Sequence, residues 1–210
     1  RGQLRRQWHS PVGNLYAALR LPLAAPFDGT AAAPAVGMLL AEALEQDGWQ
    51  VRLKWPNDLV VCGAGNQPQK VAGILLEERG GVLLAGIGIN VCWAPPAEQM
   101  RADAALEATC LKNLHKSITI VHYTAEALWQ TLVKRMFSAY IGCHSFPEGW
   151  RKRAEALLLW RGENVELRDD DRIVRGWLAG LGTSGGLCLN INGRLEEFIC
   201  GSLRLSPAQK

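Results

Sequence analysis

Four short apolar runs follow one another between residues 51 and 89, and they constrain the fold more than any other feature of this chain. They cover residues 51–54, 59–62, 71–77 and 82–89. Each run has the length of a β-strand, and the last three are bounded by glycine, asparagine or charged residues, which is the pattern of successive strands. The loop between the second and third runs is rich in glycine, asparagine and proline, so we expect these two runs to pair as a hairpin.

Helical periodicity on either side of these runs predicts an α+β fold. Apolar residues recur at spacings of three and four over 34–47 and 124–141, where a proline and a threonine suit the two N-termini. A further strand is expected over 14–23 and a short helix over 150–160. A mixed β-sheet with helices on one face follows from this order.

The C-terminal part of the chain has a different pattern. Short β-prone segments, separated by turns rich in aspartate and glycine, are expected at 165–167, 173–178, 187–191 and 198–205. They predict a small β-barrel-like module of roughly 45 residues, which is hard to stabilise unless it docks on the larger part.

Composition limits the class of protein. With 210 residues, 48% of them hydrophobic, the chain can bury one good core and a small second one. The net charge is +3 and the basic residues are spread out, so neither a nucleic acid nor a membrane is indicated as a partner. No apolar run approaches the roughly 20 residues that span a bilayer, and no signal-peptide core is evident, so a cytoplasmic location is expected.

The six cysteines predict no metal centre. They are widely spaced, with no C-x-x-C pair and no histidine nearby at ligand spacing. We therefore expect no structural metal, and most of these cysteines to be buried thiols in a reducing compartment.

Two lysines and an aspartate at strand ends are the first candidates for chemistry. Lys54 and Lys70 each lie beside an apolar run, where a lysine can neutralise a carboxylate or phosphate. The alternative for each is a surface lysine with a solvated head. Asp58 follows a Pro-Asn turn and can either hold Mg²⁺ on phosphate oxygens or only form the turn.

Two further segments carry weaker signals. Gly86-x-Gly88 ends an apolar run, where glycine indicates that a backbone or a ligand approaches closely. Three arginines between Arg1 and Arg6, ahead of Trp8, can wrap a phosphate, although an irregular chain terminus is the simpler reading.

Five motifs, in order, make the combination specific. They are Arg-Gly-x-x-x-Arg-x-Trp at 1–8, Ser-Pro-x-Gly-Asn-Leu-Tyr at 10–16, Lys-Trp-Pro-Asn-Asp at 54–58, Lys-x-Ala-Gly-Ile-Leu at 70–75, and Gly-x-Gly-Ile-Asn at 86–90. In this order they closely resemble the bacterial biotin protein ligases, the biotin–[acetyl-CoA-carboxylase] ligase family. The resemblance covers nearly the whole chain and is loosest over 91–150.

The resemblance implies a fold like that of class II aminoacyl-tRNA synthetases and biotin ligases, followed by an SH3-like barrel. A catalytic domain is then expected over 1–160 and an SH3-like domain over 161–210. It also implies a two-step reaction, in which biotin and ATP form biotinyl-5′-adenylate and the biotinyl group passes to one lysine of the biotin carboxyl carrier protein of acetyl-CoA carboxylase. ATP, Mg²⁺ and biotin are the expected ligands, and a homodimer is compatible with the family.

Roles for individual residues follow from the same resemblance. Lys70 is expected to contact the biotin carboxylate and the adenylate phosphate as the catalytic group. The remaining residues divide into an adenylate loop (Arg1, Gly2, Arg6 and Trp8), a biotin pocket (Gly73, Leu75, Gly86 and Gly88) and a nucleotide and magnesium side (Lys54, Asn57, Asp58 and Asn90).

The chain departs from the family pattern in two places. The adenylate loop has Gln3-Leu4-Arg5 where the family commonly has Arg-Arg-Gly. The chain also begins inside this loop, so about a quarter of the expected catalytic domain, with a Ser-Thr pair and a glutamine for biotin, is expected upstream of Arg1. Two alternatives stay open: a lipoate or octanoate ligase, and a relative that binds biotin or a carrier domain without catalysis.

Overall fold

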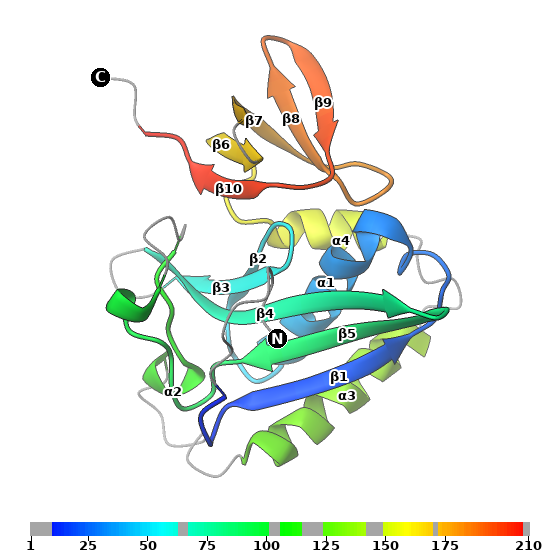
Figure 1. Ribbon diagram of the computed structural model, residues 1–210, viewed down its shortest axis with the longest axis vertical. Coiled ribbons are helices and arrows are strands. Elements are labelled where there is room, and N and C mark those ends of the chain that lie inside the picture. Colours follow the sequence, from blue (N-terminus) through cyan, green and yellow to red (C-terminus); the bar gives the residue numbers. More distant parts are fainter. Residues whose placement is uncertain are drawn as a thin grey trace.

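Two five-stranded sheets, one above the other, organise the molecule in the computed structural model (Figure 1), which describes residues 10–62, 67–100, 106–114, 124–141, 149–169 and 172–207. The first sheet has the strands β1 (Leu15–Leu21), β2 (Val51–Lys54), β3 (Asp58–Cys62), β4 (Pro68–Arg79) and β5 (Val82–Ile89). The second has β6 (Asn164–Asp169), β7 (Arg172–Leu181), β8 (Leu187–Ile191), β9 (Arg194–Phe198) and β10 (Ser202–Leu205). The helices are η2 (Gly29–Ala31), α1 (Ala32–Glu45), η3 (Ala97–Gln99), α2 (Leu111–Leu114), α3 (Ala125–Ile141) and α4 (Trp150–Leu157).

The first sheet has helices on one face only. Its strand order is β1-β5-β4-β3-β2, and each ladder between these strands is antiparallel. In β5, Leu83, Ala85, Ile87 and Ile89 are buried, whereas the residues between them lie on the opposite face. The buried face packs against α1, which contacts β2, β3 and β4, while α3 lies against β1 (Figure 1). We call the other face, which no described helix covers, the open face.

The second sheet has a buried inner face that belongs to the same hydrophobic core as the first half of the chain. Its order is β10-β6-β7-β8-β9, again antiparallel. Inward-facing Leu167, Leu178, Leu189 and Leu203 are fully buried. We call β6–β10 the C-terminal sheet.

The strands and helices mostly agree with the sequence. The α+β class and the β3–β4 hairpin are confirmed, and β2, β5 and β8 have the expected bounds. Parallel pairing occurs at two isolated bridges, Leu53 with Leu158 and Lys70 with Ala108. The first bridge ends α4 early: Leu158 is extended, and the N–H of Leu159 donates to the carbonyl of Leu53, so the helix does not reach residue 160.

Two expectations are wrong. The segment 198–205 is not one strand, because the chain turns at Gly201, whose φ is +126°, and the preceding strand β9 was not foreseen. Cysteine burial also differs: Cys110 and Cys188 are buried, but Cys62, Cys92 and Cys200 are exposed. Among the described helices, none is both long and apolar enough to span a membrane.

Candidate active site

One row of paired residues crosses the open face and brings together residues from three of the sequence motifs. Gly88 pairs with Gly73, Gly73 with Asp58, and Asp58 with Lys54. The next row pairs Leu75 with Gly86. Since paired residues share a face, these residues form one continuous surface. We call the part of this surface formed by Gly73, Gly86 and Gly88 the glycine floor.

The amine of Lys70 lies above this floor. Its Nζ is 2.5 Å from Oδ1 of Asp58, and a Cβ built on Gly73 would lie 3.3 Å from the same Nζ. The side chain of Lys70 is 38% exposed and that of Asp58 is 21% exposed, so both remain accessible to a ligand. Any side chain at position 73 would compete with Lys70 for this space.

A register shift in β4 turns Lys70 onto the open face. Leu59 pairs with Ala72 but Val60 pairs with Lys70, so Val71 is an extra residue, as in a β-bulge. Val71 and Ala72 are consequently both buried. Without the bulge, Lys70 and Gly73, three residues apart, would lie on opposite faces.

Lys54 is buried at the end of β2, with 5% of its surface exposed. This burial lowers the pKa of Lys54, the nearby Asp58 carboxylate opposes the shift, and the positive charges of Lys70 and Arg204 add to it. Arg204 belongs to β10, so the electrostatic surroundings of Lys54 include the C-terminal sheet.

The side chains of the two asparagines predicted for the nucleotide side donate hydrogen bonds to backbone carbonyl groups. Nδ2 of Asn57 donates to the carbonyl of Ile74 at 2.7 Å, and Nδ2 of Asn90 donates to that of Thr109 at 3.0 Å. Asn57 thus ties the turn after β2 to β4, and Asn90 ties the end of β5 to the segment before α2.

Asn14 has a positioning role that the sequence reasoning did not assign. Its Oδ1 accepts the backbone N–H groups of Val91, Cys92 and Trp93, each at 3.0 Å, and its Nδ2 donates to the carbonyl of Trp93 at 2.8 Å. No local signal in the motif at 10–16 reveals this role, because the bonded backbone groups lie 77 to 79 residues away in the sequence.

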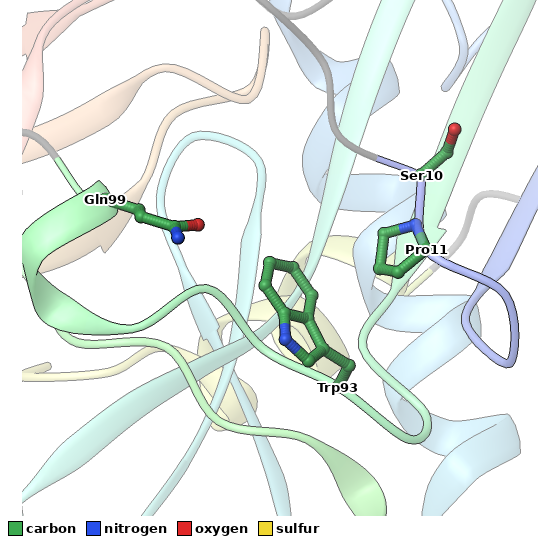
Figure 2. Close-up of a pocket in the computed structure, with 4 residues that line it drawn as sticks. All are labelled: Ser10, Pro11, Trp93 and Gln99. Atoms are coloured by element: carbon green, nitrogen blue, oxygen red, sulfur yellow. The ribbon is translucent and has the colours of Figure 1, made fainter.

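Of two cavities in the described part of the chain, the smaller is lined by predicted site residues, Asn57 and Leu75. One of about 640 Å³ is lined by Ser10, Pro11, Trp93 and Gln99, and Figure 2 shows Trp93 between Pro11 and Gln99. Another, of about 210 Å³, is lined by residues of η2 and α1, by the 55–57 turn, by 74–76 of β4 and by Ile199. The second cavity therefore has walls from both halves of the chain.

The remaining predicted residues lie elsewhere. Arg1, Gly2, Arg6 and Trp8 lie outside the described residues, and so do the four histidines. In the part of the chain that the structure describes, no group of three or more His, Cys, Asp or Glu side chains can hold a metal ion.

The sequence of this chain is similar to a family of protein ligases and to individual ligases of that kind. The model of the Biotin/lipoate A/B protein ligase family matches residues 1–92. The Bifunctional ligase/repressor BirA of Salmonella typhimurium is 26% identical over 220 residues, which cover 100% of this chain and 64% of that protein. The biotin–[acetyl-CoA-carboxylase] ligase of Mycobacterium tuberculosis is 30% identical over 175 residues, covering 83% of this chain and 59% of the relative. The chain thus spans less than two thirds of the length of these relatives.

Solved structures agree with the sequence matches. The biotin protein ligase from Aquifex aeolicus in complex with biotin and ATP is 29% identical, with a TM-score of 0.75 over 98% of this chain and 84% of that one. The biotin protein ligase from Leishmania major in complex with biotin is 20% identical, with a TM-score of 0.60 over 100% of this chain and 84% of that one, and supports the fold alone.

Proposed function

Because the chain belongs to the biotin/lipoate A/B protein ligase family, we propose that it functions as a biotin protein ligase. In this proposal biotin and ATP form biotinyl-5′-adenylate, and biotin then passes to a lysine of the biotin carboxyl carrier protein of acetyl-CoA carboxylase. The observation that carries it is the amine of Lys70, paired with Asp58 above a floor of glycines.

The glycine floor suits the flat ring and tail of biotin. Gly73, Gly86 and Gly88 present backbone without side chains, and Leu75 adds an apolar edge in the row of Gly86. A carboxylate at the end of an acyl tail that lies on this floor comes within reach of Lys70. The relative from Aquifex aeolicus, whose structure contains biotin and ATP, supports the same pair of substrates.

Lys70 is proposed to act in the first step. A carboxylate oxygen of biotin attacks the α-phosphorus of ATP, and pyrophosphate leaves with the electron pair of the broken P–O bond. Both reactants are anions, so an amine fixed between them lowers their repulsion and stabilises the charge that develops. Asp58 holds the amine above Gly73 until a substrate carboxylate competes for it.

The second step needs a nucleophile from the carrier protein. The neutral ε-amine of the carrier lysine attacks the acyl carbon of the adenylate, AMP leaves with the electron pair of the broken C–O bond, the nitrogen loses a proton to water, and an amide forms. The open face allows this approach, since no described helix covers it.

Magnesium fits this site as an ion that the phosphates of ATP help to hold. Asp58 offers one carboxylate, and magnesium commonly uses one or two carboxylates together with substrate phosphates. Asp58 would hold the ion, which would neutralise phosphate charge, and Lys54, Asn57 and Asn90 are proposed to serve the nucleotide.

We also propose that residues 1–160 belong to the catalytic domain and 161–210 to an SH3-like domain. The strands β6–β10 form a sheet that is not hydrogen-bonded to the first one, which supports this division.

Pyrophosphate release from the full-length protein tests the proposal, with biotin, lipoate or no acid present. We expect ATP-dependent release with biotin only, followed by labelling of one lysine of the carrier domain. Release with lipoate alone would indicate a lipoate or octanoate ligase. Binding of biotin without any release would indicate a non-catalytic relative, and either result overturns the assignment.

A further inference from the structure

The turn between β7 and β8 is inserted against the first half of the chain. The carbonyl of Ser184 accepts a hydrogen bond from Oγ1 of Thr30 at 2.5 Å, and the carbonyl of Gly185 accepts one from Nε1 of Trp55 at 3.1 Å. Gly185 has a φ of +80°, and a Cβ built on it would lie 2.4 Å from Cα of Ala31. Only glycine allows the turn to approach this closely.

Trp55 connects this turn to the candidate active site. It is fully buried, directly follows Lys54, and lies three residues before Asp58. The indole N–H of a buried tryptophan needs a partner, and here that partner is a carbonyl of the C-terminal sheet. A displacement of Gly185 would therefore be transmitted to the turn that carries both charged residues.

The residue before Lys54 is also bonded to a later part of the chain. Leu53 forms a bridge with Leu158, and its carbonyl accepts the N–H of Leu159, immediately after α4. The positive charge of Arg204 in β10 also contributes to lowering the pKa of Lys54. Contacts from the C-terminal part of the chain thus surround the end of β2.

The same junction also forms one wall of a cavity. Ile199, between β9 and β10, lines the space of about 210 Å³ together with Trp55, Asn57 and Leu75. The C-terminal sheet therefore adjoins the site itself as well as the scaffold behind it.

We propose that the β7–β8 turn is a positioning element of the active site, which acts through Trp55 to hold Lys54 and Asp58 where ATP is received. This inference rests on the proposed function, because it assigns the 54–58 turn to the nucleotide side. It adds a role for Gly185 and Trp55 that acts through contact between the two sheets.

The matched variants Gly185→Ala and Gly193→Ala test this inference. Both positions are turn glycines of the C-terminal sheet. Their φ values are +80° and +85°, so alanine is strained to a similar extent at each, but a Cβ at Gly193 meets nothing within 4 Å. We expect Gly185→Ala to lower kcat/KM for ATP in pyrophosphate release by about tenfold to a hundredfold, because small misplacements of reacting groups have effects of that order. The Kd for biotin should change by less than about twofold, since the glycine floor is built by β4 and β5. Gly193→Ala should leave both parameters near their wild-type values.

Hydrogen–deuterium exchange gives a readout that does not need activity. Gly185→Ala should speed backbone exchange in 54–58, and Gly193→Ala should not. Equal behaviour of the two variants, in exchange or in kinetics, would overturn the positioning role. A wild-type protein that releases no pyrophosphate would instead overturn the proposed function, while the exchange comparison would still decide the contact.

Trp55→Phe supplies a second test, because it removes the indole N–H and retains an aromatic ring. If both changes act through one contact, Trp55→Phe combined with Gly185→Ala should lose little more activity than Gly185→Ala alone. Fully additive losses in kcat/KM for ATP would contradict transmission through Trp55.

Discussion

Lys70 shows how one irregular residue sets the chemistry of the open face. The bulge at Val71 places the Lys70 amine on the same side as Asp58 and Gly73, although simple alternation predicts the opposite side. The amine then lies where the carboxylate of an acyl chain on the glycine floor would end.

Lys70→Ala should therefore impair the chemical step far more than binding. We expect pyrophosphate release to fall by about 10²–10³-fold, as when other groups that stabilise transition-state charge are removed. The Kd for biotin should rise much less. Equal losses in rate and affinity would make Lys70 a binding residue only. Lys134→Ala serves as the control, because Lys134 is an exposed lysine of α3.

Asn14 is the second residue whose role depends on its contacts. Asn14→Ala would leave the N–H groups of Val91, Cys92 and Trp93 without their acceptor, and we expect a loss of about 2–3 kcal/mol in the free energy of unfolding. The KM for ATP should rise too, because Asn90, which is assigned to the nucleotide side, directly precedes these three residues. Asn14→Asp keeps an acceptor oxygen and should retain most of the stability in urea unfolding. Equal destabilisation by both variants would mean that acceptance by Oδ1 is not the reason.

At the scale of elements, β4 and β5 build a floor in which Gly86 is not required by the fold alone. A Cβ on Gly86 would meet only the carbonyl oxygen of Leu75 at 3.5 Å and its Cβ at 3.9 Å, which are ordinary contacts. The protein has room for a side chain there, so a ligand is the better explanation of the missing one.

Gly86→Val separates these explanations. Valine favours strands, so the Tm should stay the same or rise, while the Kd for biotin should increase by at least about tenfold, as the branched side chain fills the floor. A variant with normal biotin affinity would show that biotin does not lie on Gly86. A lower Tm would show that the glycine is structural.

The outer face of the C-terminal sheet contains a buried carboxylate between arginines. Oε1 of Glu166 accepts from Arg168 at 2.6 Å, and Oε2 accepts from Arg175 at 2.8 Å. The hydrogen bonds from Arg168 and Arg175, aided by the positive charges, hold the pKa of Glu166 below its ordinary value of 4.5, against the opposing effect of burial.

The pH dependence of stability follows from this direction. Because the folded pKa is depressed, the carboxylate contributes its full stability above about pH 4.5, and the contribution is lost as pH falls through the folded value. Glu166→Gln should lower the Tm by about 2–4 °C at pH 7, corresponding to about 1 kcal/mol, since both arginines are partly exposed. Wild type and variant should converge as pH decreases below 4.5. A constant difference down to pH 3 would show that charge is not involved.

At the scale of the molecule, the two sheets are joined through α4. Oε1 of Glu155 accepts the backbone N–H of Leu181 at 3.1 Å, and the same carboxylate lies 3.5 Å from Arg161. We expected the small β-module to need contacts with the larger part of the chain. The contacts at α4 and at the β7–β8 turn are contacts of this kind.

Glu155→Ala should loosen this junction, because the buried N–H of Leu181 loses its acceptor. We expect about 1–3 kcal/mol less stability in urea unfolding, with the C-terminal sheet unfolding first. Glu163→Ala, which removes an exposed glutamate nearby, should have little effect. A similar loss in both variants would indicate a general charge effect.

The sequence alone determined what depends on local pattern. Alternating apolar residues, helical periodicity and turn glycines predicted most strands and both long helices, and the ordered motifs indicated the ligase family. Tertiary structure alone decided which of those residues meet. The bulge that reorients Lys70 depends on the register between β3 and β4, and the bond between Trp55 and Gly185 joins positions 130 residues apart. Neither contact follows from local spacing, because each is fixed by how distant strands and turns pack together.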